Sequence, residues 1–312
     1  MVFQIPSPIQ QINDPLFVQK GLSVFVKRDD LIHPQISGNK WRKLKYSIQK
    51  AELENKTHLV TFGGAFSNHL LATAAAAMHL GLKCTGIVRG EPVENETLIQ
   101  CRAMGMNLIF IDRETYRDKS GYFEHHFQND NQAYFINEGG ASAEAVWGCE
   151  ELITELPETF DHLFCSAGTG TTAAGIFSGI KKQNLKTRLH VIPALKDGGF
   201  LREEIAVYTT VNEQLTFHLN YHFGGYAKSN RALLQFIVNF YLNNQILLDP
   251  VYTGKLVFGL YDLIKNDQFE KGAKILWIHT GGLLGLLGMQ QKFEEISPGF
   301  GQIFEHLKKN NF

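Results

Sequence analysis

Short apolar runs alternate with longer amphipathic stretches along almost the whole chain. The short runs predict strands, and the amphipathic stretches between them predict helices. The expected strands are Ser23–Lys27, His58–Phe62, Cys84–Val88, Asn107–Ile111, Ala133–Ile136, His162–Cys165, Leu189–Pro193, Leu215–Leu219 and Lys274–His279. The expected helices include Asn39–Glu54, Asn68–Leu80, Ala141–Glu155, Thr172–Lys182 and Lys255–Lys265. This alternation predicts an α/β protein with mainly parallel sheets and flanking helices.

The length of 312 residues suggests about two domains, at roughly 150 residues for each. Apolar residues make up 44% of the chain, which is enough for substantial hydrophobic cores. The sequence has no evident repeat or low-complexity tract, and no linker rich in Pro, Gly or Ser marks a boundary. The position of a domain boundary therefore cannot be read from composition.

Charge and cysteine content exclude several classes of protein. The 30 basic and 31 acidic residues nearly cancel, so charge gives no reason to expect binding to nucleic acid or to an anionic membrane. The 4 cysteines form no C-x-x-C pair, so we expect reduced thiols, with no disulfide scaffold and no metal site. We also expect no secretion signal and no transmembrane helix, and hence a cytoplasmic protein.

The segment Ser37–Lys43 is the first candidate for chemistry. A Gly-Asn turn opens the predicted helix there, and Lys40 falls in the first helical turn. The positive end of the helix dipole makes a lysine unfavourable at that place and lowers its pKa. A lysine with a lowered pKa suits a Schiff-base amine. A surface lysine in a solvated loop fits the segment equally well.

Two further segments connect a predicted strand to a predicted helix. In Gly63–His69, Ser67 or Asn68 would cap the helix, and free backbone amides there would bind a carboxylate or a phosphate. In Ser166–Thr172, glycines and threonine hydroxyls form a run suited to enclosing an anion. A capped helix without a ligand is the simpler interpretation of the first segment taken alone.

The second of these segments also fits the dinucleotide pattern G-x-G-x-x-[GA], with Ala173 in the last place and Asp197 in the place of the ribose-binding acid. A dinucleotide-binding oxidoreductase is therefore a competing hypothesis. The run of hydroxyls favours a site for one terminal phosphate monoester instead. No G-x-x-x-x-G-K-[ST] motif is present, which disfavours a P-loop NTPase.

The last candidate segments, Leu248–Lys255 and Ile278–Gly282, are predicted loops, and alone each is most simply turn chemistry. Together with the earlier segments, however, they resemble one family of pyridoxal-phosphate (PLP) enzymes. This is the 1-aminocyclopropane-1-carboxylate (ACC) deaminase and D-cysteine desulfhydrase family, which has the tryptophan-synthase-β-like fold called fold type II. The resemblance runs in order from about Val26 to Gly282, and its Gly-Asn-Lys and Asp-Pro-Val-Tyr blocks are specific.

The resemblance implies a role for each matching residue. Lys40 would carry PLP covalently, and Lys43 would help to hold the phosphate. The remaining expected cofactor contacts are Asn68 at the 3′-oxygen, the phosphate loop Gly168, Thr169, Gly170, Thr171 and Thr172, and the hydroxyls of Thr253 and Thr280. The expected substrate contacts are Ser67, Asn68 and His69, which would receive the carboxylate, and the active-site tyrosines Tyr252 and Tyr226.

The family fold also implies an arrangement of domains. A smaller domain, at about residues 47–152, would be inserted into a larger PLP-binding domain made of residues 1–46 and 153–312. The family further suggests a homodimer with a small amino acid as its substrate.

Two residues depart from the patterns of relatives. Phe66 stands where many members have glutamine, and Thr253 stands where the ACC deaminases have glutamate facing the pyridine nitrogen. A hydroxyl gives no negative charge to a pyridinium, so the ring would withdraw electrons less strongly. Opening a cyclopropane demands strong withdrawal, whereas expelling thiolate from a β-carbon demands less. Thr253, Thr280 and the Ser67–His69 triplet all resemble the desulfhydrase branch.

The sequence therefore predicts a PLP-dependent lyase that performs α,β-elimination on a small amino acid, with D-cysteine converted to pyruvate, ammonia and hydrogen sulfide. Lys40, once freed by the substrate amine, would act as the general base at the α-carbon, assisted by Ser67 or Tyr252. Four alternatives remain open at this point: ACC deaminase activity, a small-amino-acid racemase, a non-enzymatic PLP-binding protein and, from a different class, the dinucleotide-binding oxidoreductase.

Overall fold

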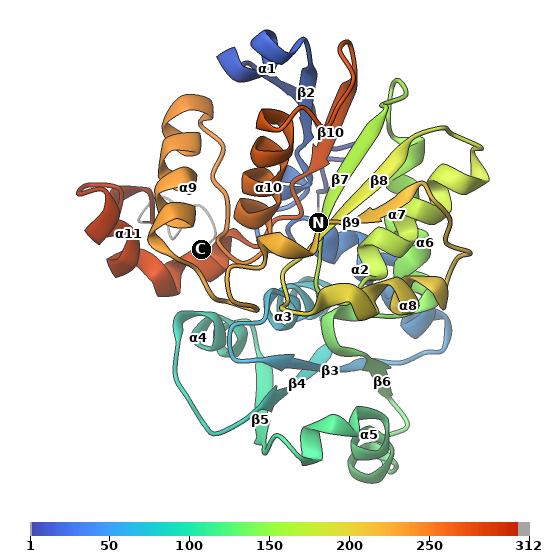
Figure 1. Cartoon of the computed structure of the whole chain (residues 1–312). Coiled ribbons are helices and arrows are strands. Elements are labelled where there is room, and N and C mark those ends of the chain that lie inside the picture. The colour runs from blue at the N-terminus through green and yellow to red at the C-terminus, as the bar shows by residue number, and fades with distance from the viewer. Residues whose placement is uncertain (1, 305–312) are drawn as a thin grey trace.

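A computed structural model describes residues 2–304 and contains two sheets built from non-consecutive strands (Figure 1). The six-stranded sheet has the order β1-β2-β10-β7-β8-β9, and the four-stranded sheet has the order β5-β4-β3-β6. The strands of the first sheet are β1 (Ile9–Ile12), β2 (Ser23–Lys27), β7 (His162–Ala167), β8 (Arg188–Pro193), β9 (Leu215–Phe217) and β10 (Lys274–Ile278). Those of the second are β3 (His58–Gly64), β4 (Lys83–Arg89), β5 (Met106–Ile111) and β6 (Ala133–Ile136).

Every strand pair is parallel except β1 with β2. The helices that flank the sheets are α1 (Pro15–Lys20), α2 (Asn39–Leu53), α3 (Asn68–Leu80), α4 (Glu96–Ala103), α5 (Lys119–Phe127), α6 (Ala143–Thr154), α7 (Thr171–Lys182), α8 (Leu201–Ala206), α9 (Arg231–Asn244), α10 (Thr253–Lys265) and α11 (Gln290–Ile296). The predicted fold class, α/β with mainly parallel sheets and flanking helices, is confirmed.

All nine predicted strands are present, with ends that differ by up to two residues. The antiparallel strand β1 was not among the predictions. Only Ile12 of its four residues is buried, and Gln10 and Gln11 are exposed, so the segment carries little of the apolar signal of a central strand. It is an edge strand whose position depends on pairing with β2.

Alternate residues of the six-stranded sheet pack into two different cores. Phe164 of β7, together with Ile275 and Trp277 of β10, packs with α9 and α10. Leu163 and Leu276, which neighbour them in sequence, pack with α7 instead. Because successive side chains of a strand point to opposite faces, helices must cover both faces of this sheet.

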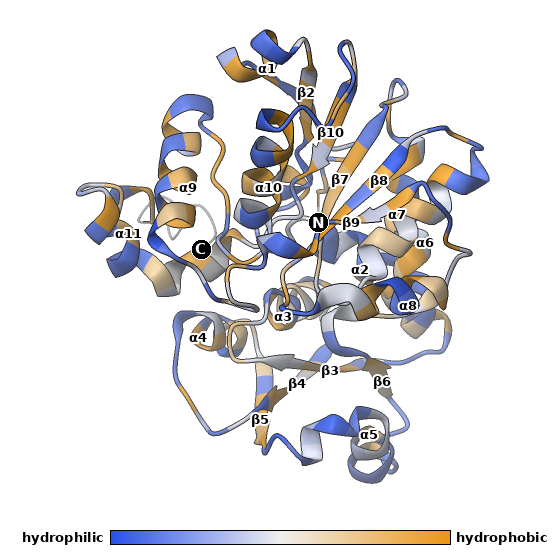
Figure 2. Cartoon of the chain, in the orientation of Figure 1, coloured by the Kyte–Doolittle hydropathy of each residue, from blue (hydrophilic) through white to orange (hydrophobic). Residues whose placement is uncertain are grey.

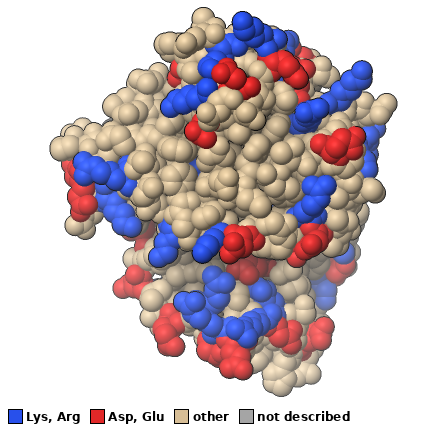
Figure 3. All heavy atoms as spheres, viewed as in Figure 1, with Lys and Arg blue, Asp and Glu red and all other residues tan. Residues whose placement is uncertain are grey.

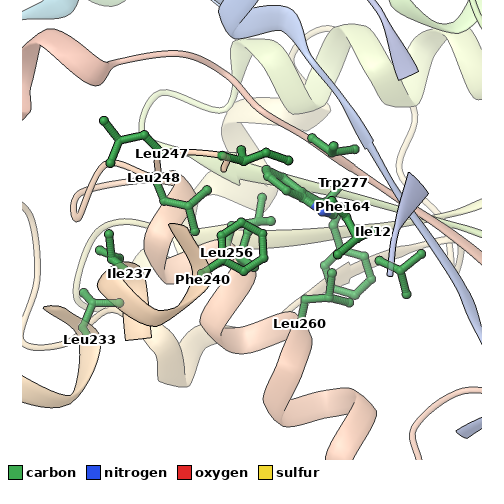
Figure 4. Close-up of a cluster of buried hydrophobic side chains, with 14 of the residues drawn as sticks. Ile12, Phe164, Leu233, Ile237, Phe240, Leu247, Leu248, Leu256, Leu260 and Trp277 are labelled. Atoms are coloured by element: carbon green, nitrogen blue, oxygen red, sulfur yellow. The ribbon is translucent and has the colours of Figure 1, made fainter. Parts of the chain in front are cut away.

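The core on the α9 and α10 side is drawn in Figure 4, where Phe240, Leu256 and Trp277 point toward one another from α9, α10 and β10. In Figure 2 these helices carry both hydrophobic and hydrophilic residues along their length, as expected of helices with one buried side. The core thus joins elements that are far apart in the sequence.

The four-stranded sheet lies below the larger one in Figure 1, and its strands all fall between residues 58 and 136. They are therefore inserted in sequence between β2 and β7 of the larger sheet. The predicted boundaries of the inserted domain, residues 47 and 152, stay a prediction.

The start of α2 is pressed against the loop that follows β10. A side chain on Gly38 would place its Cβ atom 1.9 Å from the carbonyl oxygen of Thr280, which is far inside contact distance. Gly38 also has a φ of +64°, which side chains of L-residues rarely adopt. The backbone N–H of Asn39 then donates to the same Thr280 oxygen at 3.3 Å. Glycine is therefore required for α2 to begin at this place.

One turn into α2, Arg42 is 2% exposed and forms bidentate contacts with two carboxylates. Its guanidinium donates to Asp29 at 2.7 and 2.8 Å and to Glu155 at 2.7 and 2.9 Å. Lys27 of β2 adds a contact of 2.9 Å to Glu155, and Ser7 donates to Asp29 at 2.6 Å. This buried network ties α2 to β2 and to the end of α6.

Membrane spans, cysteines and surface charge can also be compared with the expectations from the sequence. Within residues 2–304, no helix is both long and apolar enough to span a membrane. The four cysteines are free and buried. Figure 3 shows basic and acidic side chains near one another on the visible face, consistent with the nearly balanced charge.

We predict that Arg42→Met lowers the free energy of unfolding by about 3–5 kcal/mol, because the buried carboxylate of Asp29 loses its cationic partner and Glu155 keeps only Lys27. Urea unfolding monitored by circular dichroism measures the change. Lys20→Met is the control, since Lys20 pairs with a carboxylate, Asp267, that is 76% exposed; exposed pairs contribute little. Equal losses in the two variants would show that the Arg42 network does not hold α2.

Candidate active site

A cavity of about 710 Å³ opens where the two sheets meet. It is lined by the ends of β3 and β7, by the loop after β10, and by the starts of α2, α3 and α7. The carboxyl ends of parallel strands and the amino ends of the following helices therefore converge on one space, which is where α/β proteins bind ligands.

Most of the predicted site residues line this cavity although they come from distant parts of the chain. Those that line it are Lys40, Lys43, Ser67, Asn68, His69, Gly168, Thr169, Gly170, Thr172, Tyr226, Tyr252 and Thr280. Two predicted residues, Thr171 and Thr253, are buried and do not line it. Thr171 supports the loop indirectly, since its hydroxyl lies 3.1 Å from that of Thr169.

Thr253 lies behind the cavity wall because its hydroxyl is engaged elsewhere. It donates to Asp249 at 2.7 Å and accepts from the backbone N–H of Asp249 at 2.9 Å. The structure therefore does not bring the Thr253 side chain to the place predicted for it, facing a cofactor ring. Thr280 does line the cavity, and its hydroxyl lies 3.4 Å from that of Ser166.

Three lysines lie in or near this region, and their partners differ. Lys255 is 1% exposed and donates to three backbone carbonyls, so its amine is held within the fold. Lys43 donates to Gly139 O at 3.0 Å and to Thr169 Oγ1 at 3.3 Å. Lys40 donates to Asn39 Oδ1 at 2.6 Å. No backbone carbonyl holds the Lys40 amine among the hydrogen bonds of the described residues.

Burial and, to a lesser degree, the nearby charge of Lys43 lower the pKa of Lys40, while Cys149 and Asp249 act in the opposite direction, and the net value is about 7. A large fraction of this amine is therefore neutral at neutral pH and able to act as a nucleophile. Burial also lowers the pKa of Lys255, to about 8, but its three carbonyl partners leave that amine no access to the cavity.

The loop before α7 provides a site for an anion. Helix α7 begins after Gly170 with no side-chain cap, so backbone N–H groups remain at its positive end. The hydroxyl of Thr169 and the amine of Lys43 lie beside the same turn. A Cβ atom on Gly168 would lie 3.0 Å from the phenolic oxygen of Tyr252, so that glycine keeps the loop open. Backbone donors, hydroxyls and one cation form a set that suits a phosphate.

Ser67 caps α3, and this limits what it can offer to a ligand. Its Oγ accepts from the backbone N–H groups of His69 at 3.2 Å and Leu70 at 3.3 Å. The serine oxygen is thus occupied, whereas its own proton can still be donated. Asn68 lies next to it, against Gly282. The predicted carboxylate site at this turn therefore retains the Ser67 hydroxyl and Asn68 as donors.

The side chain of His69 is a neutral acceptor. Thr61 donates its only hydroxyl proton to Ile136 O at 2.8 Å, so it must accept from His69 Nε2, also at 2.8 Å. The other ring nitrogen, Nδ1, then bears a lone pair and is buried without a hydrogen-bond partner. Burial lowers the pKa of His69 well below its ordinary value, and the charges of Lys40 and Lys43 lower it further. The ring cannot donate to a substrate carboxylate in this state.

Two tyrosines form another wall of the cavity. The rings of Tyr252 and Tyr226 lie 6.1 Å apart at 71°, and their hydroxyls interact. Burial raises the pKa of Tyr252 well above its ordinary value, and Tyr226 adds to that shift. The Tyr252 phenol is therefore protonated at neutral pH and can act as a proton donor.

The comparisons with known proteins agree with this geometry. The family model described as pyridoxal-phosphate dependent enzyme matches residues 4–281. This chain belongs to that family. Lys40 and the loop before α7 are thus parts of a PLP enzyme, which decides against a dinucleotide-binding oxidoreductase.

Two individual relatives and one solved structure match most of this chain. A bifunctional D-cysteine desulfhydrase/1-aminocyclopropane-1-carboxylate deaminase of Arabidopsis thaliana is 30% identical, over 90% of this chain and 77% of that protein. A D-cysteine desulfhydrase of Salmonella newport is 28% identical, over 89% of this chain and 92% of that protein. The crystal structure of an ACC deaminase homologue superposes with a TM-score of 0.82 at 30% identity, covering 95% of each chain. The predicted resemblance and fold type II are confirmed.

The residues of the cavity fit PLP. Gly168–Thr172 and Lys43 would hold its phosphate, because that turn combines free helix N–H groups with a cation. Lys40 would hold its aldehyde carbon, since it is the lysine whose amine reaches the cavity with a pKa near neutrality. Asn68 and Thr280 line the same space and would contact the ring.

Sequence reasoning missed several residues of the cavity. Asn39 stands inside the Gly-Asn-Lys block, and its place next to Lys40 was an available signal. Asp249 belongs to the Asp-Pro-Val-Tyr block, but no role was predicted for it. Arg89 is the last residue of β4 and Glu138 follows β6, and both line the cavity. No local pattern marks those two, because only the packing of the two sheets brings them there.

We predict that Gly170→Leu weakens PLP binding at least tenfold, because its Cβ would lie 3.3 Å from Ile205 and 3.4 Å from Glu204 of α8 and would displace the turn that receives the phosphate. Absorbance titration of the cofactor-free protein measures the affinity. Gly81→Leu is the matched control, since Gly81 has a similar positive φ, +67° against +76°, but open space around it. Both variants incur backbone strain of about 1–2 kcal/mol. Unchanged PLP affinity in folded Gly170→Leu would give the loop another role.

Proposed function

We propose that this enzyme is a lyase that performs α,β-elimination on a small D-amino acid, with D-cysteine converted to pyruvate, ammonia and hydrogen sulfide. The names of the relatives support both D-cysteine desulfhydrase and ACC deaminase activity. The choice between them depends on how strongly the site can hold positive charge on the cofactor ring. The D-cysteine desulfhydrase and ACC deaminase activities are both deaminations by a PLP-dependent lyase.

The choice of D-cysteine desulfhydrase over ACC deaminase activity rests on one observation. Among the described residues, both acidic side chains that line the cavity already have partners. Asp249 accepts from the N–H groups of Val251, Tyr252 and Thr253 and from the Thr253 hydroxyl, at 2.7–2.9 Å. Glu138 forms an ion pair of 3.3 Å with Lys119. Neither carboxylate is free to stabilise a protonated ring nitrogen.

Thr280 is the residue that we assign to the ring nitrogen. It lines the cavity and offers a hydroxyl in place of a carboxylate. A neutral partner provides less stabilisation for a pyridinium, and hence weaker withdrawal of electrons. That suffices to expel a good leaving group such as thiolate, and it disfavours opening a cyclopropane.

When bound, PLP supplies a carbonyl that bonds to the amine of an amino acid and a ring that withdraws electrons from its α-carbon. The neutral amine of Lys40 takes the proton from that carbon, since its pKa is about 7. The Ser67 hydroxyl and Asn68 orient the carboxylate. The Tyr252 phenol, protonated at neutral pH, donates a proton to the departing sulfur.

Phe66 broadens the proposed specificity. It lines the cavity and is 60% exposed, so an apolar ring stands at the mouth, at the position where the family resemblance implies glutamine in many members. A ring cannot hydrogen-bond a polar substrate group, and it can pack against an apolar one. We therefore expect turnover of other small amino acids that bear a leaving group on the β-carbon.

We predict that Ser67→Ala retains the yellow colour of bound PLP but lowers kcat about 10²-fold or more, because the hydroxyl orients the substrate carboxylate and a misplaced substrate reacts slowly. Ser142→Ala is the matched control, since Ser142 also caps a helix, by accepting from Ala145 N at 3.1 Å. Each variant loses about 1 kcal/mol of capping energy. Similar turnover in both variants would leave Ser67 with its capping role alone.

A substrate panel tests the proposed reaction. Purified enzyme is given D-cysteine, L-cysteine, D-serine or ACC, and sulfide and α-keto acid are measured. We predict sulfide and pyruvate from D-cysteine, and little or no 2-oxobutanoate from ACC. Faster deamination of ACC than desulfuration of D-cysteine would overturn the proposal and favour the ACC deaminase alternative. Loss of chirality without keto acid would favour a racemase.

A further inference from the structure

Asn39 is a buried amide between the Lys40 amine and the loop before α7. It is 9% exposed and lines the cavity. Its Oδ1 accepts from Lys40 Nζ at 2.6 Å, and its Nδ2 donates to Thr172 Oγ1 at 2.9 Å. Its backbone N–H donates to Thr280 O at 3.3 Å. The side chain thus joins the lysine to the turn that would hold the phosphate.

The chemistry of the neighbours fixes which way this amide faces. A protonated lysine can only donate, so the oxygen of Asn39 must face Lys40 and the nitrogen must face Thr172. Thr172 accepts from that nitrogen and directs its own proton toward the Cys149 sulfur, with which its hydroxyl interacts. Turning the amide around would place two donors against the lysine.

We propose that Asn39 is a positioning residue, which holds the amine of Lys40 in the cavity whenever that amine is not bonded to the cofactor. This inference rests on the role that the proposed function gives to Lys40. A hydrogen bond to Oδ1 restricts rotation about the last bond of the side chain and leaves the remaining face of the nitrogen toward the cavity. The amine is then returned to one orientation in each turnover.

The neutrality of Asn39 matters as much as its position. Lys40 is surrounded by Lys43 on its own helix, His69 on α3, Cys149 on α6 and Asp249 before α10. Burial and Lys43 together bring its pKa to about 7. An amide oxygen accepts a hydrogen bond without adding a charge, so the amine can still lose its proton near neutrality. A carboxylate at the same place would keep it charged.

The test titrates Lys40 in the cofactor-free protein, without substrate. Competitive labelling with an amine-acylating reagent at a series of pH values, followed by peptide mass spectrometry, gives the pKa of each lysine. For the wild type we expect about 7 at Lys40. Asn39→Asp should raise this pKa by about 1–3 units, because an opposite charge then adjoins the amine. Asn39→Ala should lower it, because the charged form loses an acceptor.

Each variant carries its own controls. Lys255 is titrated in the same digest, and its pKa should not move, because its partners are the carbonyls of Ala194, His222 and Gly225. Circular dichroism confirms the fold of each variant. An unchanged pKa of Lys40 in both folded variants would overturn the proposal. Because no substrate is present, an error in the proposed reaction leaves this readout unaffected.

A second readout is the rate at which added PLP is captured on Lys40 by borohydride reduction. One unit of pKa increase leaves about tenfold less neutral amine at pH values below both pKa values. Asn39→Asp should therefore slow capture about tenfold or more at about pH 6, which is below both pKa values, and capture should recover as the pH rises. A loss that does not recover at high pH would contradict the proposed positioning role and indicate direct damage to cofactor binding.

Discussion

The guanidinium of Arg42, buried between Asp29 and Glu155, holds the first turns of α2 in place, and the active site depends on that position. Lys40 and Lys43 lie on the same turns and project into the cavity. A buried ion pair is costly unless every charge has a partner, and here Arg42 makes four short contacts. The network thus keeps both amines in the cavity. At the start of an isolated helix they would be exposed to water.

The second constraint is the close approach of Gly38 to Thr280, which brings the start of α2 against the end of β10. The smaller sheet contributes the Ser67–His69 turn from the opposite side. Two cations, Lys40 and Lys43, then share a largely buried space with a helix amino end. Each of these features favours an anion, and together they lower the cost of losing a proton from Lys40. The cavity is therefore suited to a phosphate and an electrophile at the same time.

The alternation of strands and helices was enough to predict the fold class, because parallel sheets with helices on both faces produce long apolar strands. Most of the predicted site residues line the cavity as well, since Lys40, Ser67 and Gly168–Thr172 each follow a recognisable strand or turn. The place of Thr253 could not be predicted. Whether its hydroxyl faces the cavity or Asp249 depends on how the turn before α10 closes. Arg89 and Glu138 were missed because only the packing of the two sheets brings them to the cavity.

Lys40 is the lysine that we expect to carry the cofactor. Borohydride reduction of the yellow enzyme, followed by peptide mapping, identifies the lysine that bears the pyridoxyl group. We predict the label on Lys40, which lines the cavity and has a pKa of about 7. A label on Lys43 would contradict it, since that amine is assigned to the phosphate, and so would a label on Lys255, which three carbonyls hold away from the cavity.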